Sequence, residues 1–173
     1  GLEMAVLHLL PTLWFRNTWV WGCRHEGCWA KPLIQLADSN TLRTHHTTLE
    51  PFRFAVDVAS DGTSLEWLFT DNATNTLRLF GVPNQSPYVK DAFHDYVVNG
   101  RKEAVNPRMF GTKAAAHFRA EVPGGGEVTV RARLFAESQT PDEIFGRTFR
   151  RIMAERSDEA DQFYAEMIPA ELD

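Results

Sequence analysis

The chain has 173 residues, 43% of them hydrophobic and 12% aromatic, so it is long enough and apolar enough to bury one core of ordinary size. Its net charge of −5, with basic residues scattered along the chain, argues against a protein that binds nucleic-acid phosphates. No run is long enough to cross a bilayer and the first residues lack a signal-peptide pattern, so we expect no membrane partner and either a cytoplasmic location or a missing leader.

Alternating apolar and polar residues predict a series of strands in the first half of the chain. The first is expected over residues 5–15, with Pro11 at an edge or a bulge. Further strands are expected over residues 30–36, 41–48, 52–59, 64–70 and 76–80. The strand over 41–48 is rich in Thr and His, which predicts that it is exposed. Ser60–Gly62 is typical of a hairpin turn between the two strands that flank it.

The second half begins with a helical pattern over residues 88–98, which Asn99–Gly100 should end. A loop follows at 105–110, and alternating segments at 112–122 and 127–135 flank a glycine-rich turn, which predicts a second hairpin. Thr140, Pro141 and Glu143 form a capping-box pattern. We therefore expect a long helix that begins there and stops before Pro169.

Many strands separated by short turns, followed by one long helix, indicate a mainly β chain. We predict an antiparallel β-sandwich over residues 1–137, with one short helix inside it. Residues 138–173 are predicted to form a C-terminal linker helix.

Three of the five tryptophans, Trp14, Trp19 and Trp21, lie within eight residues. Such a cluster can pack in a core, contact another domain or form a platform on which sugar rings stack. Arg16 and Asn17 favour the domain contact, because a guanidinium and an amide between indoles can bind a carboxylate or a carbonyl across a domain boundary. The same two groups could bind sugar hydroxyls.

Cys23 and Cys28 frame His25, but a structural zinc site needs four ligands and no second pair lies nearby in the sequence. We expect no metal there; a small disulfide loop and two thiols in a turn both remain open, with reducing cytoplasm favouring thiols.

Lys90, Asp91, His94 and Asp95 bring charge onto one short helix, which is more typical of a solvated face or a local salt bridge than of an acid–base pair. The sequence contains no nucleophile elbow and no phosphate-binding loop, so it predicts no cofactor.

The stretch Leu-His-Leu-Leu-Pro-Thr-Leu-Trp-Phe-Arg-Asn-Thr-Trp, residues 7–19, resembles a segment of the large bacterial glucosidase-like proteins of glycoside hydrolase family 63. Residues 88–94, 104–107, 111–117 and 160–165 agree with the same family in the same order. The resemblance covers nearly the whole chain and lies in the β-sandwich that precedes the catalytic barrel of that family.

The resemblance implies a fragment of a longer bacterial, cytoplasmic enzyme in which the sandwich supports an (α/α)6 barrel. Inverting glycosidases use two carboxyl groups roughly 6.5–9.5 Å apart, and the family carries both in the barrel. No residue here matches them, so we expect a non-catalytic chain that is inactive alone and whose partner is the barrel of the same parent chain. Self-association of the fragment is a further expectation.

The alternative is a stand-alone carbohydrate-binding module that holds an oligosaccharide on residues 14–21, which contain the three clustered tryptophans and are called the Trp-rich segment below. A small enzyme with its own site has no motif in its support.

Overall fold

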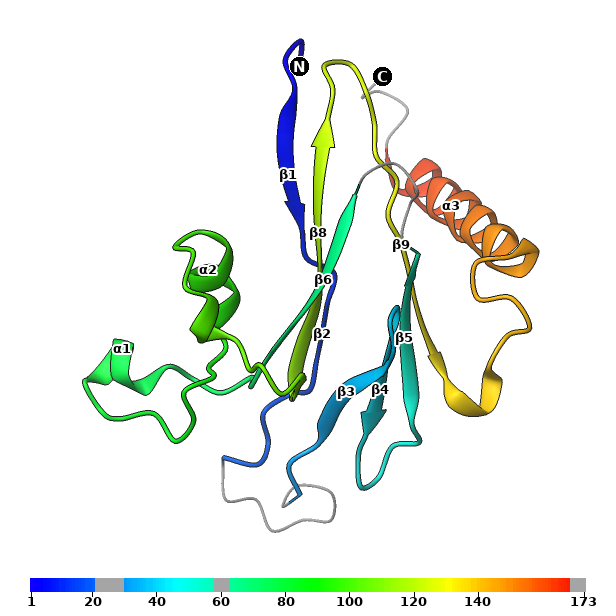
Figure 1. The fold of residues 1–173 in the computed structure, drawn as a ribbon. Helices are drawn as coiled ribbons and strands as arrows, with labels where there is room; N and C mark the ends of the chain where they lie inside the picture. The colour runs from blue at the N-terminus through cyan, green and yellow to red at the C-terminus, as the bar shows by residue number, and fades with distance from the viewer. Residues whose placement is uncertain (21–29, 58–62, 169–173) are drawn as a thin grey trace. The chain divides into compact units, whose positions relative to one another are not determined.

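The computed structural model describes residues 1–20, 30–57 and 63–168 (Figure 1). The chain divides into two compact units, Gly1–Gln139 and Thr140–Asp173, which are described separately below. Trp21, Cys23, Cys28 and the turn Ser60–Gly62 lie outside the described residues.

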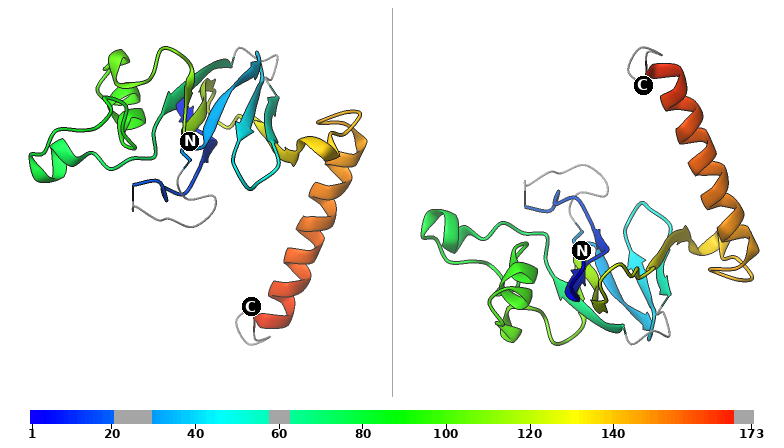
Figure 2. Two further views of the ribbon diagram at one scale, coloured as in Figure 1. Left: turned by 90° about the horizontal axis from the view of Figure 1, so that it is seen from below. Right: turned by 90° about the horizontal axis from the view of Figure 1, so that it is seen from above.

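The first unit is mainly β, as predicted, and its strands are antiparallel and form two sheets (Figures 1 and 2). One sheet has the order β1-β8-β2, with β6 on the other edge of β8, and the second has the order β7-β3-β4-β5-β9. The strands are β1 (Ala5–Leu9), β2 (Thr12–Trp14), β3 (Leu33–Asp38), β4 (Thr41–His45), β5 (Phe52–Asp57), β6 (Ser64–Thr70), β7 (Phe110–Gly111), β8 (Lys113–Val122) and β9 (Arg131–Ala136). The helical elements are α1 (Thr76–Phe80), α2 (Ala92–Val97) and the short 3-10 turns η1 (Lys102–Ala104) and η2 (Glu137–Gln139).

The main core is made by the facing surfaces of the two sheets, which gives a β-sandwich-like unit. Its buried members are Ile34, Leu42, Phe54, Val56, Phe69, Ala114, Ala116 and Phe118. Leu65 and Trp67 pack on this core from the same face of β6 as Phe69, as the alternation along that strand predicts. The opposite face of β6 carries Leu68, which packs with α2 in a second, smaller cluster.

The predicted strand over residues 5–15 is interrupted, and β1 and β2 both pair with β8, from Ala5 opposite Val122 to Trp14 opposite Lys113. The break lies at Leu10 and Pro11. Pro11 has no N–H to give to the ladder, but its carbonyl accepts a hydrogen bond from the amide of Ala116 at 3.1 Å.

Both predicted hairpins are wrong. β5 pairs with β4 and β9, whereas β6 pairs with β8, so residues 52–57 and 64–70 belong to different sheets. β8 and β9 are likewise in different sheets. A strand has only two edges, and the two edges of β5 and of β8 are already occupied by other partners.

Two further predictions about single elements are also wrong. Residues 76–80 form helix α1 rather than a strand, because the Asn75 side chain caps the first turn and Gly81 adopts a left-handed conformation, φ +69°, at its end. The strand over 41–45 is central in its sheet, so Thr41, Leu42 and Thr44 are buried rather than exposed. The helix predicted over 88–98 is confirmed as α2.

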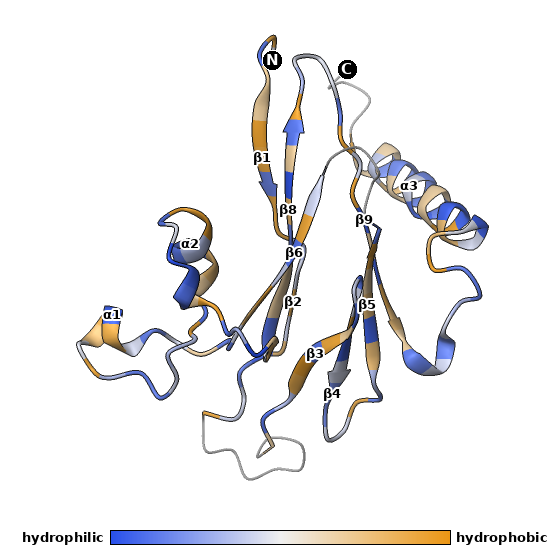
Figure 3. Cartoon of the chain, viewed as in Figure 1, coloured by the Kyte–Doolittle hydropathy of each residue, from blue (hydrophilic) through white to orange (hydrophobic). Residues whose placement is uncertain are grey.

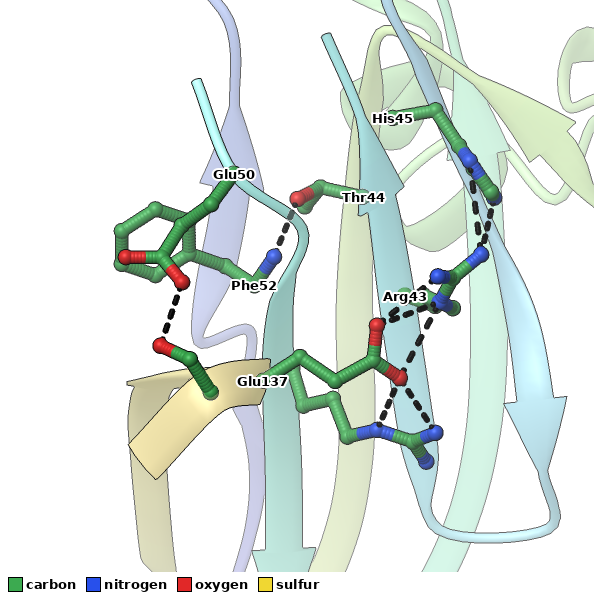
Figure 4. A network of polar contacts seen from close by, with 8 residues as sticks. Arg43, Thr44, His45, Glu50, Phe52 and Glu137 are labelled. Atoms are coloured by element: carbon green, nitrogen blue, oxygen red, sulfur yellow. Dashed lines mark hydrogen bonds and ion pairs between the residues drawn. The ribbon is translucent and has the colours of Figure 1, made fainter. Parts of the chain in front are cut away.

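A glutamate joins three strands of the five-stranded sheet (Figure 4). Glu137 follows β9, and its carboxylate accepts hydrogen bonds from Arg43 on β4 at 2.8–3.2 Å and from Arg53 on β5 at 2.6–3.0 Å. These bonds lower the pKa of Glu137 to about 2.

The second unit contains one long helix, α3 (Arg147–Met167). The predicted capping box does not start it: the helix begins at Arg147, with Gly146 as its N-cap and no side-chain cap bond. Gly146 lies inside the predicted helix, and glycine is a poor helix former there. No residue of α3 is buried, and it exposes large apolar side chains that alternate with charged ones along the ribbon (Figure 3).

No helix within the described ranges has the length and apolar character of a membrane span.

Candidate functional site

The Trp-rich segment leaves the sheet at the end of β2 and is held in place by main-chain and amide contacts. The Phe15 amide donates to the Thr112 carbonyl at 2.9 Å. The Asn17 amide group donates to the carbonyl of Asn72, and the Asn72 amide group donates back to the carbonyl of Phe15, both at 2.9 Å. These reciprocal bonds tie the segment to the turn that follows β6.

The same contacts place four of the five predicted site residues around one hollow of about 690 Å³. They are Trp14, Arg16, Asn17 and Trp19; the fifth, Trp21, lies outside the described residues. The side chain of Trp14 is 55% exposed, so its indole is available at the hollow rather than buried in the core. A hollow of this volume falls in the size range of small-molecule sites, roughly 300–1,000 Å³.

A buried carboxylate lies at the polar side of the hollow. Asp71 accepts hydrogen bonds from the amide and the hydroxyl of Thr112, both at 3.3 Å, and forms an ion pair with Lys31 at 2.7 Å. The Thr112 hydroxyl in turn accepts a bond from the amide of Asn72 at 2.8 Å. Asp71 is therefore fully engaged in positioning the turn, and its charge is balanced by Lys31.

The polar cluster depends on close packing of the backbone of β7 against the end of β6. A Cβ atom on Gly111 would lie 2.1 Å from the carbonyl oxygen of Thr70, so only glycine lets β7 approach the end of β6 this closely. This approach brings Thr112 within reach of Asp71.

The other wall of the hollow comes from the segment around α1. Asn75 donates to Asp91 at 3.2 Å, and Arg78 forms an ion pair with Asp91 at 2.8 Å. Burial opposes ionisation of Asp91, but the hydrogen bonds from Arg78 and Asn75 outweigh it and hold the pKa of Asp91 below its usual range. Asp91 and Asp95 thus lie in ion pairs, with Arg78 and Arg101, as the sequence favoured.

The segment over residues 77–82, which includes most of α1, is strongly apolar and exposed. Its large side chains are Leu77, Leu79, Phe80 and Val82, each more than half exposed, with Phe80 at 69%. Figure 3 shows this segment as an orange patch at α1. Val82 and Pro83 also line the hollow, so the end of this apolar segment reaches the hollow that the Trp-rich segment lines. A patch of this kind marks a contact surface more often than a free one.

Sequence reasoning missed Lys31, Asp71, Asn72 and the segment over 82–90 as parts of this site. In the sequence, Asp71 and Asn72 are typical of an ordinary turn. The available signal was their position directly after the apolar strand β6, but only the fold shows that this turn meets the Trp-rich segment. Among the described residues, no group of three or more His, Cys, Asp or Glu is placed to hold a metal ion.

Comparison with known proteins gives one informative match. The chain is 32% identical over 197 aligned positions to the uncharacterized protein YMR196W of Saccharomyces cerevisiae, in an alignment that covers 97% of this chain and 18% of the yeast protein. The chain therefore spans about a fifth of the length of this relative. No family model and no solved structure matches.

Proposed function

We propose that this chain is the non-catalytic β-sandwich portion of a glycoside hydrolase family 63-like α-glycosidase, and that it packs on and supports the catalytic (α/α)6 barrel of the same parent chain. The observation that carries the proposal is that Trp14 and Trp19 line one hollow together with Val82, which belongs to the exposed apolar segment over residues 77–82. Exposed apolar segments of this kind mark contact surfaces.

The composition of this surface fits a domain contact. Large aromatics and arginine are the residues enriched at the centre of interfaces, and here Trp14, Arg16 and Trp19 line one hollow with Val82 and Pro83. The exposed apolar side chains of α3 support the proposal separately, because a helix with that surface is expected to be covered by further protein.

Catalysis is assigned to the barrel of the parent, with inversion at the anomeric carbon by a carboxylic acid and a carboxylate. In the hollow, Asp71 is engaged by Lys31 and Thr112, and outside its lining Asp91 lies in a pair with Arg78. The described part of the hollow therefore offers support and contact rather than an acid–base pair. A cytoplasmic location in a bacterium is part of the same proposal.

The test uses the full protein encoded by the gene. Its hydrolysis of α-glucosides should release product of inverted configuration, as followed by proton NMR. Phe80→Ser should lower both its melting temperature and its activity, because it places a hydroxyl in the contact. The matched control is Leu49→Ser, which changes a side chain that is 52% exposed but lies in a different part of the chain from the apolar segment over residues 77–82. Equal behaviour of the two variants would contradict the contact.

A stand-alone carbohydrate-binding module is the second candidate, and the exposed indole of Trp14 at a hollow of about 690 Å³ favours it. Maltose-type or mannose-type oligosaccharides should then quench tryptophan fluorescence in a saturable way at millimolar concentration or below. Trp14→Ala should abolish the response with the fold intact. A linear, non-saturating response would leave the domain contact as the better account.

A further inference from the structure

A second hollow, of about 180 Å³, lies on the other face of the β6–β8 pair from the main core. Glu66 and His117 point to the same side of their strands as Leu68 and Ala115, which pack on α2. Its lining is dominated by groups that carry or exchange protons: His8, Ser64, Glu66, Tyr96, Val97, Lys102, His117 and Arg119.

Two imidazoles meet across the β1–β8 ladder. Nδ1 of His8 lies 2.7 Å from Nε2 of His117, and the rings are stacked with centroids 5.0 Å apart. At this distance only one proton fits between the two nitrogens. The pair therefore keeps its hydrogen bond when neutral or singly charged, and loses it when both rings are fully protonated.

The inner ring of this pair is poorly solvated. His117 is 8% exposed, and its Nδ1 atom is buried without a hydrogen-bond partner. Its nearest carboxylate oxygen is Oε2 of Glu66 at 3.7 Å, beyond hydrogen-bond distance. The other oxygen of Glu66 is occupied, since it accepts a bond from the Tyr96 hydroxyl at 2.5 Å.

Two elements bring positive charge to the lining of this hollow. Lys102 on η1 lies 3.6 Å from the centre of the Tyr96 ring, and Arg119 on β8 is the residue opposite His8 in the ladder. Glu66 on β6 is the carboxylate that faces the pair, Tyr96 on α2 is neutral, and Glu121 on β8 is held by Arg119 at 3.2 Å. A second proton on the pair therefore meets repulsion from the first proton and from Lys102, which Glu66 opposes.

Burial, and then the charge of His8, lower the pKa of His117 below its ordinary value of 6.5, with Glu66 opposing. A histidine with a lowered pKa in the folded state contributes stability that is fully present above pH 6.5. That contribution is lost as the pH falls through the folded-state pKa.

The strand that the pair holds is weakly buried. Every residue of β1 is exposed, so the strand depends on its ladder to β8 and on side-chain contacts such as that of His8. We propose that the His8–His117 pair is a proton-sensitive latch: it holds edge strand β1 on β8 at neutral pH and releases it when both rings are charged. Release leaves the edge of β8 over residues 118–122 open to pair with another strand.

The test is amide hydrogen exchange by NMR on the 173-residue chain between pH 7.5 and pH 4.5, expressed as protection factors to remove the intrinsic pH effect. Protection in the β1–β8 ladder should fall by about five- to tenfold more than in the β6–β8 ladder, the change expected for one lost hydrogen bond. His8→Phe keeps a stacked ring without a proton and should remove this difference. The matched control His94→Phe, at an exposed position of α2, should retain it.

The imidazole resonances of the unmodified chain give a second readout that needs no variant. The pair should take up its two protons in separate steps, because the first proton makes the second harder to add. Two rings that titrate together in one step would overturn the latch, as would a difference between the ladders that persists in His8→Phe.

Discussion

Single residues in this chain hold together segments that lie far apart in the sequence. Glu137 joins β4 and β5 to the end of β9 through Arg43 and Arg53, and Asp71 joins β6 to Thr112 and Lys31. Each carboxylate has at least two donors, which is the arrangement that makes charged hydrogen bonds specific as well as stabilising.

The first prediction concerns Glu137. Glu137→Gln keeps the shape of the side chain but removes its charge, so the melting temperature at pH 7 should fall. The folded-state pKa is about 2 and the ordinary value is 4.5, so the contribution of the carboxylate is complete above pH 4.5 and is lost between pH 4.5 and 2. Melting curves should therefore show a gap between the two proteins that narrows across that interval.

The control for this experiment is Glu121→Gln, which breaks a single exposed contact with Arg119 at 3.2 Å. It should change the melting temperature little at any pH, because exposed single pairs contribute little to stability. An equal effect of the two variants would show that Glu137 does not join the strands.

At the scale of elements, α1 is a helix that is stabilised mainly by hydrogen bonds at its ends. It is only five residues long and none of its residues is buried. Asn75 accepts a hydrogen bond from the Arg78 amide at 3.0 Å, and Asn84 accepts another from the amide of Leu77 at 3.1 Å. These caps satisfy amides that a helix start leaves without partners inside the helix.

Asn75→Ala should destabilise α1 by about 0.5–2 kcal/mol, as the loss of an N-cap does. Because α1 has no buried residue, the loss should be local: hydrogen exchange at Leu79 and Gly81 should accelerate while the global melting temperature changes little. Asn99→Ala, which removes an exposed bond to Asp95 at 2.8 Å just after the end of α2, is the control. Unchanged exchange at α1 in the Asn75 variant would contradict the capping role.

At the scale of the whole chain, two surfaces within the described residues expose large apolar side chains and are suited to contact with further protein. One joins the Trp-rich segment to α1, and the other runs along α3. Under the proposed function both meet the rest of the parent protein. Purified alone, the 173-residue chain should then expose apolar surface, bind a hydrophobic dye and self-associate.

The chain alone should also show no turnover of α-glucosides, because its described carboxylates around the hollow are engaged in positioning contacts. The measurement is glucose release against a blank without protein. Turnover that saturates with substrate and disappears in Asp71→Asn would place catalysis in this chain and overturn the proposal.

Local patterns were sufficient for the elements that depend on their own residues. Alternation predicted strands over residues 52–59 and 64–70, which form β5 and β6, and helical spacing over residues 88–98 predicted the helix that contains α2. Local patterns failed where two signals competed. At residues 76–80 the apolar residues suggested a strand, but the Asn75 cap and Gly81 set a helix, and at 140–146 a capping box preceded a glycine that delays the helix to Arg147.

The candidate site was likewise predictable from the sequence only in part. The density of indoles and the neighbouring Arg16 and Asn17 were enough to single out the Trp-rich segment from the sequence. The turn at Asp71 and Asn72 carries no special local signal, and it enters the site only because β6 and β2 are neighbours of the same strand, β8.

The sequence by itself therefore determined the mainly β class, most strand positions and the segment around which the site is built, because alternation, turn residues and aromatic clusters act over a few neighbouring positions. Only the tertiary structure decided which strands pair. Turn signals at residues 60–62 and 123–126 look like hairpins, but the edges of β5 and β8 are taken by strands from elsewhere in the chain. Pairing depends on which edge is free and which face is apolar across the whole sheet, and no window of neighbouring residues contains that information.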